Sequence, residues 1–380
     1  MMTAIFPVVL ALASCGSAPA GDKPGAPTAS EADFTVTPVA RFDEPWAMAF
    51  LPGTPFALVT ERKGRLKLWH EDGPLREVDG VPEVAYAGQG GLGDVAPAPD
   101  FATSGTVYLT WAEPGDGGTR GAALGRARLA LDGAPRLEGL QVIWRQQPKV
   151  TGDGHYSHRI AFSPDGRYLF LSSGDRQKLT PAQAMDGNLG KIVRLLPDGT
   201  PAPGNPFADK GGVAAQIWTL GHRNVLGLKF DAQGRLWDLE HGPRGGDELN
   251  LVEPGRNYGW PLVSNGDHYS GEPIPRHATR PDLAAPAISW NPVIAPGDFI
   301  FYRGDTFPAW RGQAVIAAMK PAGIVRVAIE GDRAREVARH PTRYRIREIV
   351  ERDDGSVWLL EDGEEAGAGR LLRLSPGRQK

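Results

Sequence analysis

The sequence predicts an all-β protein built as a six-bladed β-propeller. In three segments, an apolar stretch leads to a short turn with Asp-Gly or a related pair and then to a β-rich stretch: residues 159–175, 227–242 and 346–363. Their turn glycines Gly166, Gly234 and Gly355 are 68 and 121 residues apart. These gaps approximate one and two copies of a unit of roughly sixty residues. About 345 residues would hold six such units, and radial repetition of four-stranded sheets protects their edges.

Composition agrees with this fold and excludes some functions. The chain has 380 residues, 41% of them hydrophobic, so it can form a substantial core. Its 49 glycines and 34 prolines favour turns and short strands over long helices. A net charge of −3 gives no electrostatic case for binding nucleic acid or an anionic membrane surface. The alternative fold, two β-sandwich domains, is disfavoured because no linker-like change of composition interrupts residues 34–380.

The N-terminal region has the character of an export signal. Residues 4–13 form an apolar run that is too short to span a bilayer and is typical of a signal-peptide core. The Leu-Ala-Ser-Cys sequence that ends at Cys15 resembles a bacterial lipobox. We therefore expect a lipoprotein-type signal peptide over 1–15, lipidation at Cys15, a flexible tether over 16–33, and a periplasmic or membrane-tethered protein. No positive charge precedes the apolar run, and a buried N-terminal strand is the alternative.

A histidine and an acid flank one of the predicted strands. His155 lies in the loop before it, and Asp175 lies at the end of the next strand. A histidine with a near-neutral pKa can act as a general base, and a carboxylate can orient its ring and stabilise the imidazolium. His155 and His158 could also be read as a metal pair, but no third ligand has a matching spacing. A solvated loop histidine is the remaining alternative.

Polar and basic residues follow predicted strand ends in several repeats. They are Gln89, Arg223, Asn224, Lys320, Arg345 and Arg347. Arg345 and Arg347 are two residues apart, so in an extended segment both guanidinium groups point to the same side. Singly, each cation could be a solvated surface charge. Together, they indicate a convergent anion-binding site.

The Gly242-Pro243 corner has the features of a calcium site. Backbone carbonyls and carboxylates are ligands that calcium accepts readily, and Asp247 and Glu248 lie close by in the sequence. No EF-hand loop is present. A plain turn with surface acids is the alternative.

Several short motifs follow one another along the chain in a fixed order: GQGGL, GHYSHR followed by SSGD, GNLGKIVRL, GHRN, HGPRGGDELN, NYGWP and RIRE. This order resembles the soluble PQQ-dependent sugar dehydrogenases. The resemblance is closest to the bacterial aldose sugar dehydrogenase branch of the glucose/sorbosone dehydrogenase family, and it covers about residues 42–374.

The resemblance implies a six-bladed propeller that holds pyrroloquinoline quinone (PQQ) and calcium on its channel axis. It also implies oxidation of the anomeric carbon of aldoses to lactones, with electrons passed to an unidentified acceptor. His155 matches the catalytic base and Asp175 its supporting acid. Cofactor- or substrate-contacting positions match Gln89, Arg223, Asn224, Lys320, Arg345 and Arg347. The carbonyls of Gly242 and Pro243 match ligands of the cofactor-bound calcium. Glu248 and the Tyr258 carbonyl match a second, structural calcium site.

The chain departs from the family pattern at a few positions. Val293 stands where Ser or Thr is usual, His158 replaces a small residue beside the base, and Gly93 and Pro97-Ala98 replace bulkier residues. These changes bear on substrate preference and cofactor affinity. Two other functions stay open: a calcium-dependent propeller hydrolase such as a lactonase, and a non-catalytic propeller that binds a glycan or a protein. Nothing in the sequence decides between a monomer and a dimer.

Overall fold

The computed structural model describes residue 1, residues 34–364 and residues 368–377. The expected signal peptide, the lipidation site at Cys15 and the tether fall on residues 2–33, outside the described residues. Within the described part of the chain, no helix combines the length and the apolar character needed to cross a membrane.

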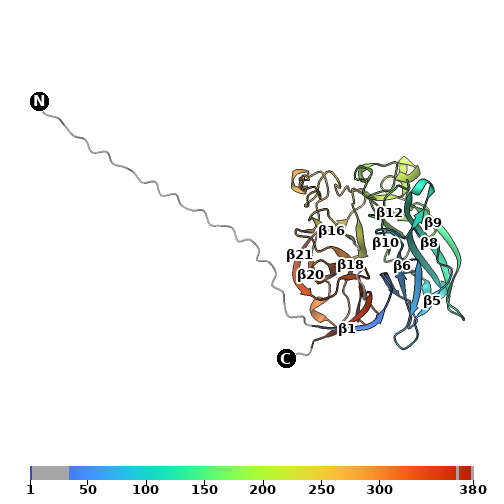
Figure 1. The fold of residues 1–380 in the computed structure, drawn as a ribbon. Coiled ribbons are helices and arrows are strands. Elements are labelled where there is room, and N and C mark those ends of the chain that lie inside the picture. Colours follow the sequence, from blue (N-terminus) through green and yellow to red (C-terminus); the bar gives the residue numbers. More distant parts are fainter. Residues whose placement is uncertain (2–33, 365–367, 378–380) are drawn as a thin grey trace.

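The described chain folds as six four-stranded antiparallel sheets, which confirms the predicted six-bladed propeller (Figure 1). The innermost strands contact one another around a closed ring, from β2 through β6, β10, β14, β18 and β22 back to β2. Blade 1 contains β2 (Pro45–Phe50), β3 (Ala57–Glu61), β4 (Arg65–Trp69) and β5 (Arg76–Val78). Blade 2 contains β6 (Leu92–Pro97), β7 (Thr106–Pro114), β8 (Arg120–Ala130) and β9 (Arg136–Arg145). Blade 3 contains β10 (Ser157–Phe162), β11 (Leu169–Ser173), β12 (Lys191–Leu195) and β13 (Ile217–Leu220).

Blade 4 contains β14 (Val225–Phe230), β15 (Leu236–Glu240), β16 (Asp247–Val252) and β17 (Ile288–Trp290). Blade 5 contains β18 (Pro296–Phe301), β19 (Ala314–Met319), β20 (Ala322–Glu330) and β21 (Arg333–Pro341). Blade 6 contains β22 (Ile346–Glu351), β23 (Val357–Glu361), β24 (Arg370–Pro376) and β1 (Phe34–Arg41). Short helical turns lie in the connections: α1 (Phe101–Ser104), η1 (Asp116–Gly118), η2 (Thr180–Gln183), η3 (Ala208–Lys210), η4 (Gly212–Gln216), η5 (His277–Thr279) and η6 (Pro308–Trp310).

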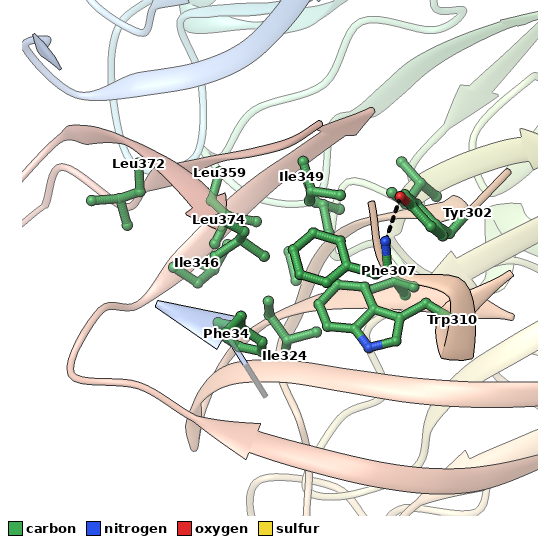
Figure 2. Close-up of a cluster of buried hydrophobic side chains, with 14 of the residues drawn as sticks. Phe34, Tyr302, Phe307, Trp310, Ile324, Ile346, Ile349, Leu359, Leu372 and Leu374 are labelled. Carbon is green, nitrogen blue, oxygen red and sulfur yellow. Dashed lines mark hydrogen bonds between the residues drawn. The ribbon is translucent and has the colours of Figure 1, made fainter. Parts of the chain in front are cut away.

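The first strand of the fold closes the ring. β1 pairs antiparallel with β24, so it completes the sheet that the last three strands begin (Figure 1). Phe34 at the start of β1 packs edge-on against Phe307 and Trp310 of blade 5 (Figure 2). Removing β1 would therefore expose an unpaired edge on β24 and open a core between two blades.

The hydrophobic core is divided among the blade interfaces. Six clusters of buried side chains each join two neighbouring blades, and together they run around the whole ring. The cluster in Figure 2 joins blades 5 and 6, and the Tyr302 hydroxyl there accepts a hydrogen bond from the Phe307 backbone N–H at 3.1 Å. Because apolar side chains cover both faces near the middle of each sheet, second strands such as β3, β11, β15, β19 and β23 are buried throughout. The outermost strands are much more exposed, as β1, β9 and β21 show.

The predicted tight turns are confirmed in blades 3, 4 and 6. Gly166, Gly234 and Gly355 lie between the first and second strands of these blades, with φ of 71°, 75° and 78°. Glycine adopts this left-handed conformation without steric cost. Blades 2 and 5 have α1 and η6 at the corresponding connection, so they lack the Asp-Gly signal.

Every innermost strand has an irregularity near its first residues. The pairing register shifts between residues 1 and 3 or 1 and 4 of β2, β6, β10, β14, β18 and β22. A bulge of this kind re-aims side chains, because the strict alternation of a regular strand is broken. Both His158, which lines a cavity on the axis, and its neighbour Arg159, which contacts residues of other blades, can therefore face the channel.

Arg159 is the centre of an ionic network across the channel. Its Nη1 lies 2.7 Å from Glu348 of β22, 3.4 Å from Asp94 of β6 and 4.0 Å from Asp298 of β18. Its guanidinium also lies 4.1 Å from the ring centre of Trp46 on β2. Lys229 of β14 adds a second cation, 2.8 Å from Asp298. The network therefore joins the innermost strands of all six blades.

The charges of this network balance if one carboxyl group stays protonated. Burial raises the pKa of Glu348 well above its usual range, and this effect exceeds the opposing effect of Arg159. Burial also raises the pKa of Asp94, although less strongly. Burial would lower the pKa of Arg159, but the surrounding carboxylates raise it, so Arg159 stays charged. Glu348 is thus the carboxyl group that most readily keeps a proton.

We predict that Arg159→Met destabilises the fold strongly. The substitution keeps much of the side-chain volume but leaves buried carboxylates without their cation, which typically costs about 3–5 kcal/mol. Urea denaturation followed by tryptophan fluorescence measures the change in the free energy of unfolding. Arg167→Met is the matched control, because Arg167 pairs with Asp165 at the surface with 72% of its side chain exposed. Equal denaturation midpoints for the two variants would show that the network does not stabilise the propeller.

Candidate active site

A cavity of about 220 Å³ lies on the channel axis, beside the Arg159 network. Gln89, Asn224, Arg345 and Arg347, all expected site residues, line it. Its remaining walls include Trp46, Arg62, Tyr156, His158 and His241. A second cavity of about 370 Å³ lies at the other side of the network and is lined by Asp94, Lys229 and Glu348. The network therefore separates two halves of the channel.

His155 and Asp175 meet as the sequence predicts. His155 Nδ1 lies 2.7 Å from Asp175 Oδ1, and the His155 backbone N–H donates to Gln89 Oε1 at 2.7 Å. His155 is 6% exposed, and its backbone has a left-handed φ of 50°. His155 does not line the axial cavity itself. Gln89, which accepts its backbone N–H, and Tyr156, which follows it in the sequence, both do. The neighbouring Ser157, His158 and Arg176 also have left-handed φ values, and such backbone strain often accompanies functional sites.

The protonation of this pair follows from its surroundings. Burial would raise the pKa of Asp175, but hydrogen bonds from His155, Trp260 and Gln177 together lower it, so the carboxylate is ionised and acts only as an acceptor. His155 Nδ1 must then donate its N–H to Asp175. Burial lowers the pKa of His155 more than Asp175 raises it. At neutral pH, His155 is therefore a neutral imidazole with its lone pair on Nε2.

Arg176 holds the loop that carries His155, a role the sequence reasoning missed. Its guanidinium donates to the carbonyl oxygens of Gly154 and Arg120, at 2.8 and 2.6 Å, and to that of Gly152. It also lies 3.8 Å from the ring centre of Tyr156. Because Arg176 follows Asp175 directly, the base and its acid are fixed by the same short segment.

Arg345 and Arg347 reach the axial cavity together, as their spacing predicts. Arg345 Nη2 and Arg347 Nε contact the two oxygens of Asp362 at 2.9 and 3.0 Å. Burial opposes ionisation of Asp362, but the two arginines lower its pKa. One carboxylate thus orients two guanidinium groups. Asp362 escaped the sequence reasoning, and so did Arg62, a third cation of the cavity wall.

Glu240 holds the backbone of Arg223 and Asn224. Its Oε2 accepts the backbone N–H of Arg223 at 2.7 Å and that of Asn224 at 3.3 Å. The Asn224 side chain reaches Ser157 at 3.2 Å, next to the base. Arg223 Nη1 donates to the His241 carbonyl at 3.0 Å. Its Nε is buried with no hydrogen-bond partner among the described residues.

The Gly242-Pro243 corner presents free carbonyl groups. No described residue donates a hydrogen bond to the carbonyl oxygen of Gly242 or Pro243. The corner is held from behind by Asp247, whose carboxylate accepts the backbone N–H groups of Gly242, Ile294 and Ala295 at 2.7–2.9 Å. Asp247 therefore fixes the backbone of the corner through its carboxylate.

Glu248 and Tyr258 line a small cavity of about 10 Å³ together with Gly242 and Pro243. That volume suits one water-sized or ion-sized occupant. Glu248 accepts a hydrogen bond from His277 at 3.1 Å, and Tyr258 stacks on His222 at 4.7 Å. The residues expected for the two calcium sites therefore lie next to each other around this cavity.

Lys320 lies apart from the other expected cations of the axial cavity. It is exposed and lines a neighbouring cavity of about 720 Å³ together with Val293, Gly242 and Pro243. His241 and Ala295 line both this cavity and the axial one, so the two are adjacent.

A cluster of three buried polar side chains was not anticipated from the sequence. Ligand atoms of His222, Asp238 and Glu240 lie within 4.8 Å of one another, a spacing that could hold a metal ion. The described residues whose ligand atoms cluster closely enough to hold a metal ion do not include His155 or His158, so the alternative of a metal pair there gains no support.

Comparison with known proteins identifies the family of the chain. The model of the Glucose / Sorbosone dehydrogenase family matches residues 42–373. The chain is 38% identical over 344 residues to aldose sugar dehydrogenase YliI of Escherichia coli K12, covering 88% of this chain and 91% of that protein. A solved glucose dehydrogenase superposes with a TM-score of 0.84 at 43% identity, covering 89% of this chain and 99% of the other.

A PQQ-bound aldose sugar dehydrogenase from Streptomyces coelicolor superposes with a TM-score of 0.74 at 27% identity, covering 92% of this chain and 99% of the other. The family model spans all six blades, from just before β2 into β24. The chain therefore belongs to the glucose/sorbosone dehydrogenase family.

Proposed function

We propose that this protein oxidises the anomeric carbon of aldose sugars to lactones, using PQQ and calcium, with His155 as general base. Membership of the family makes the chain an oxidoreductase that acts on sugars. The observation that carries the finer proposal is the neutral, carboxylate-supported His155 beside a cavity walled by cations.

The residues present fit a tricarboxylated quinone. Arg62, Arg345 and Arg347 line the axial cavity, and Arg223 and Lys320 lie at the adjoining cavities. Several cations are needed because the quinone carries three carboxylates, and arginine binds carboxylates in a bidentate fork. The Nε of Arg223 is buried and has no partner in the described part of the chain, so it is a donor that a bound anion would satisfy.

The corner residues fit calcium. The carbonyls of Gly242 and Pro243 are free acceptors, and hard cations prefer such oxygen ligands. We assign these two carbonyls to the cofactor-bound calcium. The Glu248 carboxylate and the Tyr258 carbonyl would hold the second, structural ion. A bound quinone polarised by calcium would supply the hydride acceptor for sugar oxidation.

In this proposal, the chain's own residues handle the proton. His155 Nε2 would take the proton of the anomeric hydroxyl as hydride leaves the anomeric carbon that bears this hydroxyl. Asp175 holds Nδ1–H in place and stabilises the imidazolium that forms. Gln89 fixes the backbone of His155 through its 2.7 Å hydrogen bond, which keeps the base in line with the cavity. Export to the periplasm, with or without a lipid anchor at Cys15, belongs to the same proposal, and the electron acceptor is unidentified.

Reconstitution tests the proposal against a hydrolase and a binding protein. Purified apo-protein is titrated with calcium and PQQ while absorbance is followed, and aldoses are then added with an artificial electron-accepting dye. We expect saturable binding and dye reduction that require both PQQ and calcium. Lactone hydrolysis without the quinone would favour the calcium-dependent hydrolase, and sugar binding without dye reduction would favour a non-catalytic glycan-binding propeller.

His155→Ala should bind PQQ normally and lose most of its turnover. A positioned general base contributes about 10²–10⁴-fold to rate, so kcat should fall by that order. Absorbance titration gives the dissociation constant of PQQ, and the dye assay gives kcat. His70→Ala is the control, because His70 packs against Phe56 on blade 1, away from the axial cavity. Unchanged turnover in His155→Ala would remove His155 from this role.

Asp175→Asn should shift the pH profile toward acid. The Asp175 carboxylate raises the pKa of His155, and burial lowers it. Without the negative charge, the pKa of His155 falls further, so the acidic limb of kcat/KM moves to lower pH. The maximum should also fall, because the neutral amide no longer stabilises the imidazolium. A pH series of kcat/KM measures both effects, and an acidic limb that moves to higher pH would contradict the assignment.

A further inference from the structure

His158 occupies the wall of the axial cavity with a buried aromatic ring. It is 2% exposed and lines the cavity beside Asn224 and Arg347. Its ring stacks on Trp46 with centres 5.1 Å apart and planes 10° apart, and it meets Tyr156 edge-on at 6.2 Å. Since Trp46 also contacts Arg159, the ring rests on the side chains that close the channel.

The ring can take this place only because residue 93 has no side chain. A Cβ at Gly93 would lie 1.7 Å from His158 Cε1 and 2.1 Å from Nδ1, far inside van der Waals contact. Gly93 lies on β6 and His158 on the neighbouring inner strand β10. Gly93 and His158, which the resemblance marks as two separate departures from the family pattern, are therefore coupled by one exchange of volume.

The hydrogen bonds of the Thr110 hydroxyl determine which ring nitrogen of His158 carries the proton. The Thr110 hydroxyl contacts the His158 carbonyl at 2.9 Å and His158 Nδ1 at 2.7 Å, and it accepts the Asp94 backbone N–H at 2.8 Å. A hydroxyl has a single proton. All three contacts are hydrogen bonds at once only if Thr110 donates to the carbonyl and His158 Nδ1–H donates to Thr110.

Nε2 is then an unprotonated acceptor, and no described residue donates to it. Burial, with added repulsion from Arg159 and Arg176, lowers the pKa of His158 to about 3. The ring therefore stays neutral in ordinary buffers. Nδ1 is occupied by Thr110, so Nε2 is the polar atom that the ring can offer to a ligand in the cavity.

We propose that His158 is a ligand-binding residue that sets the polarity of the axial cavity, with Nε2 as a fixed acceptor for an N–H or O–H donor of the bound cofactor or sugar. The proposal rests on the proposed function for the identity of the ligand. PQQ offers its pyrrole N–H as a donor, and an aldose offers hydroxyl groups. Both sources share the same chemistry, a donor directed at a neutral imidazole nitrogen.

A pair of substitutions tests the acceptor. His158→Phe keeps an aromatic ring on Trp46 and removes Nε2, whereas His158→Gln places an amide that can accept again. If the donor belongs to PQQ, the dissociation constant of PQQ for the apo-protein should rise about three- to tenfold in His158→Phe and recover in His158→Gln. If the donor belongs to the sugar, KM should rise by a similar factor at unchanged PQQ affinity and kcat. His70→Phe is the control.

Unchanged PQQ affinity and unchanged KM in a folded His158→Phe would overturn the acceptor role. Long-range ¹⁵N NMR of the histidine rings gives a readout independent of turnover: Nε2 of His158 should show the shift of an unprotonated nitrogen from pH 5 to 8. A protonated Nε2 would also overturn it. Failure of the wild-type protein to bind PQQ or oxidise any aldose would refute the proposed function instead, and the NMR result would still decide the tautomer.

The exchange of volume is tested by a double-mutant cycle of stability. Gly93→Ala should lower the melting temperature of the wild-type protein and have little effect in a His158→Ser background, where the clashing ring is gone. Equal losses in both backgrounds would show that the two positions are not coupled.

Discussion

The ionic contacts of Arg159 are the constraint on which the rest of the structure depends. A propeller has apolar cores between its blades, but its inner strands surround an axis that apolar packing alone does not close. Here Glu348, Asp94 and Asp298 from three blades converge on one guanidinium group, and Trp46 covers it. Because removing the cation would leave Asp94 and Glu348 without their ion-pair partner, the blades are held to one arrangement about the axis. The network also divides the channel, which gives the axial cavity a floor.

The bulges of the inner strands explain how one set of strands builds both the floor and the site. Second residues of four inner strands, Trp46, His158, Leu226 and Arg347, line the axial cavity. Third residues, including Asp94, Arg159, Asp298 and Glu348, form the network. In a regular strand, neighbouring residues would point to opposite faces. The irregular register lets consecutive residues face the axis, so the ligand cavity rests directly on the most constrained contacts of the fold.

Local patterns in the sequence predicted what depends on local geometry. The tight turns at Gly166, Gly234 and Gly355 revealed the repeat, and the two-residue spacing of Arg345 and Arg347 placed both in one cavity. The sequence could not predict which strands pair when they are far apart in the chain. Asp362 orients those arginines only because β22 pairs with β23, and β1 joins blade 6 from the other end of the chain. Asp247 shows the same limit: the sequence places its carboxylate beside Glu248, but only folding brings the N–H groups of Ile294 and Ala295 to it.

Buried carboxylates that accept backbone N–H groups hold the GHRN and HGPRGGDELN motifs in place. Glu240 holds the GHRN segment, and Asp247 holds the Gly242 corner, so negative charge is used to fix backbone while carbonyls and guanidinium groups face the cavities. Trp260 of NYGWP then links the two halves of the site. Its indole N–H donates to Asp175 at 2.7 Å, and its ring lies 5.3 Å from the Arg223 guanidinium. The Asp175 backbone N–H in turn donates to the Arg223 carbonyl at 2.9 Å. His155, Asp175 and Arg223 are therefore parts of one connected unit, so a substitution that moves Arg223 would also disturb the carboxylate that orients the His155 ring.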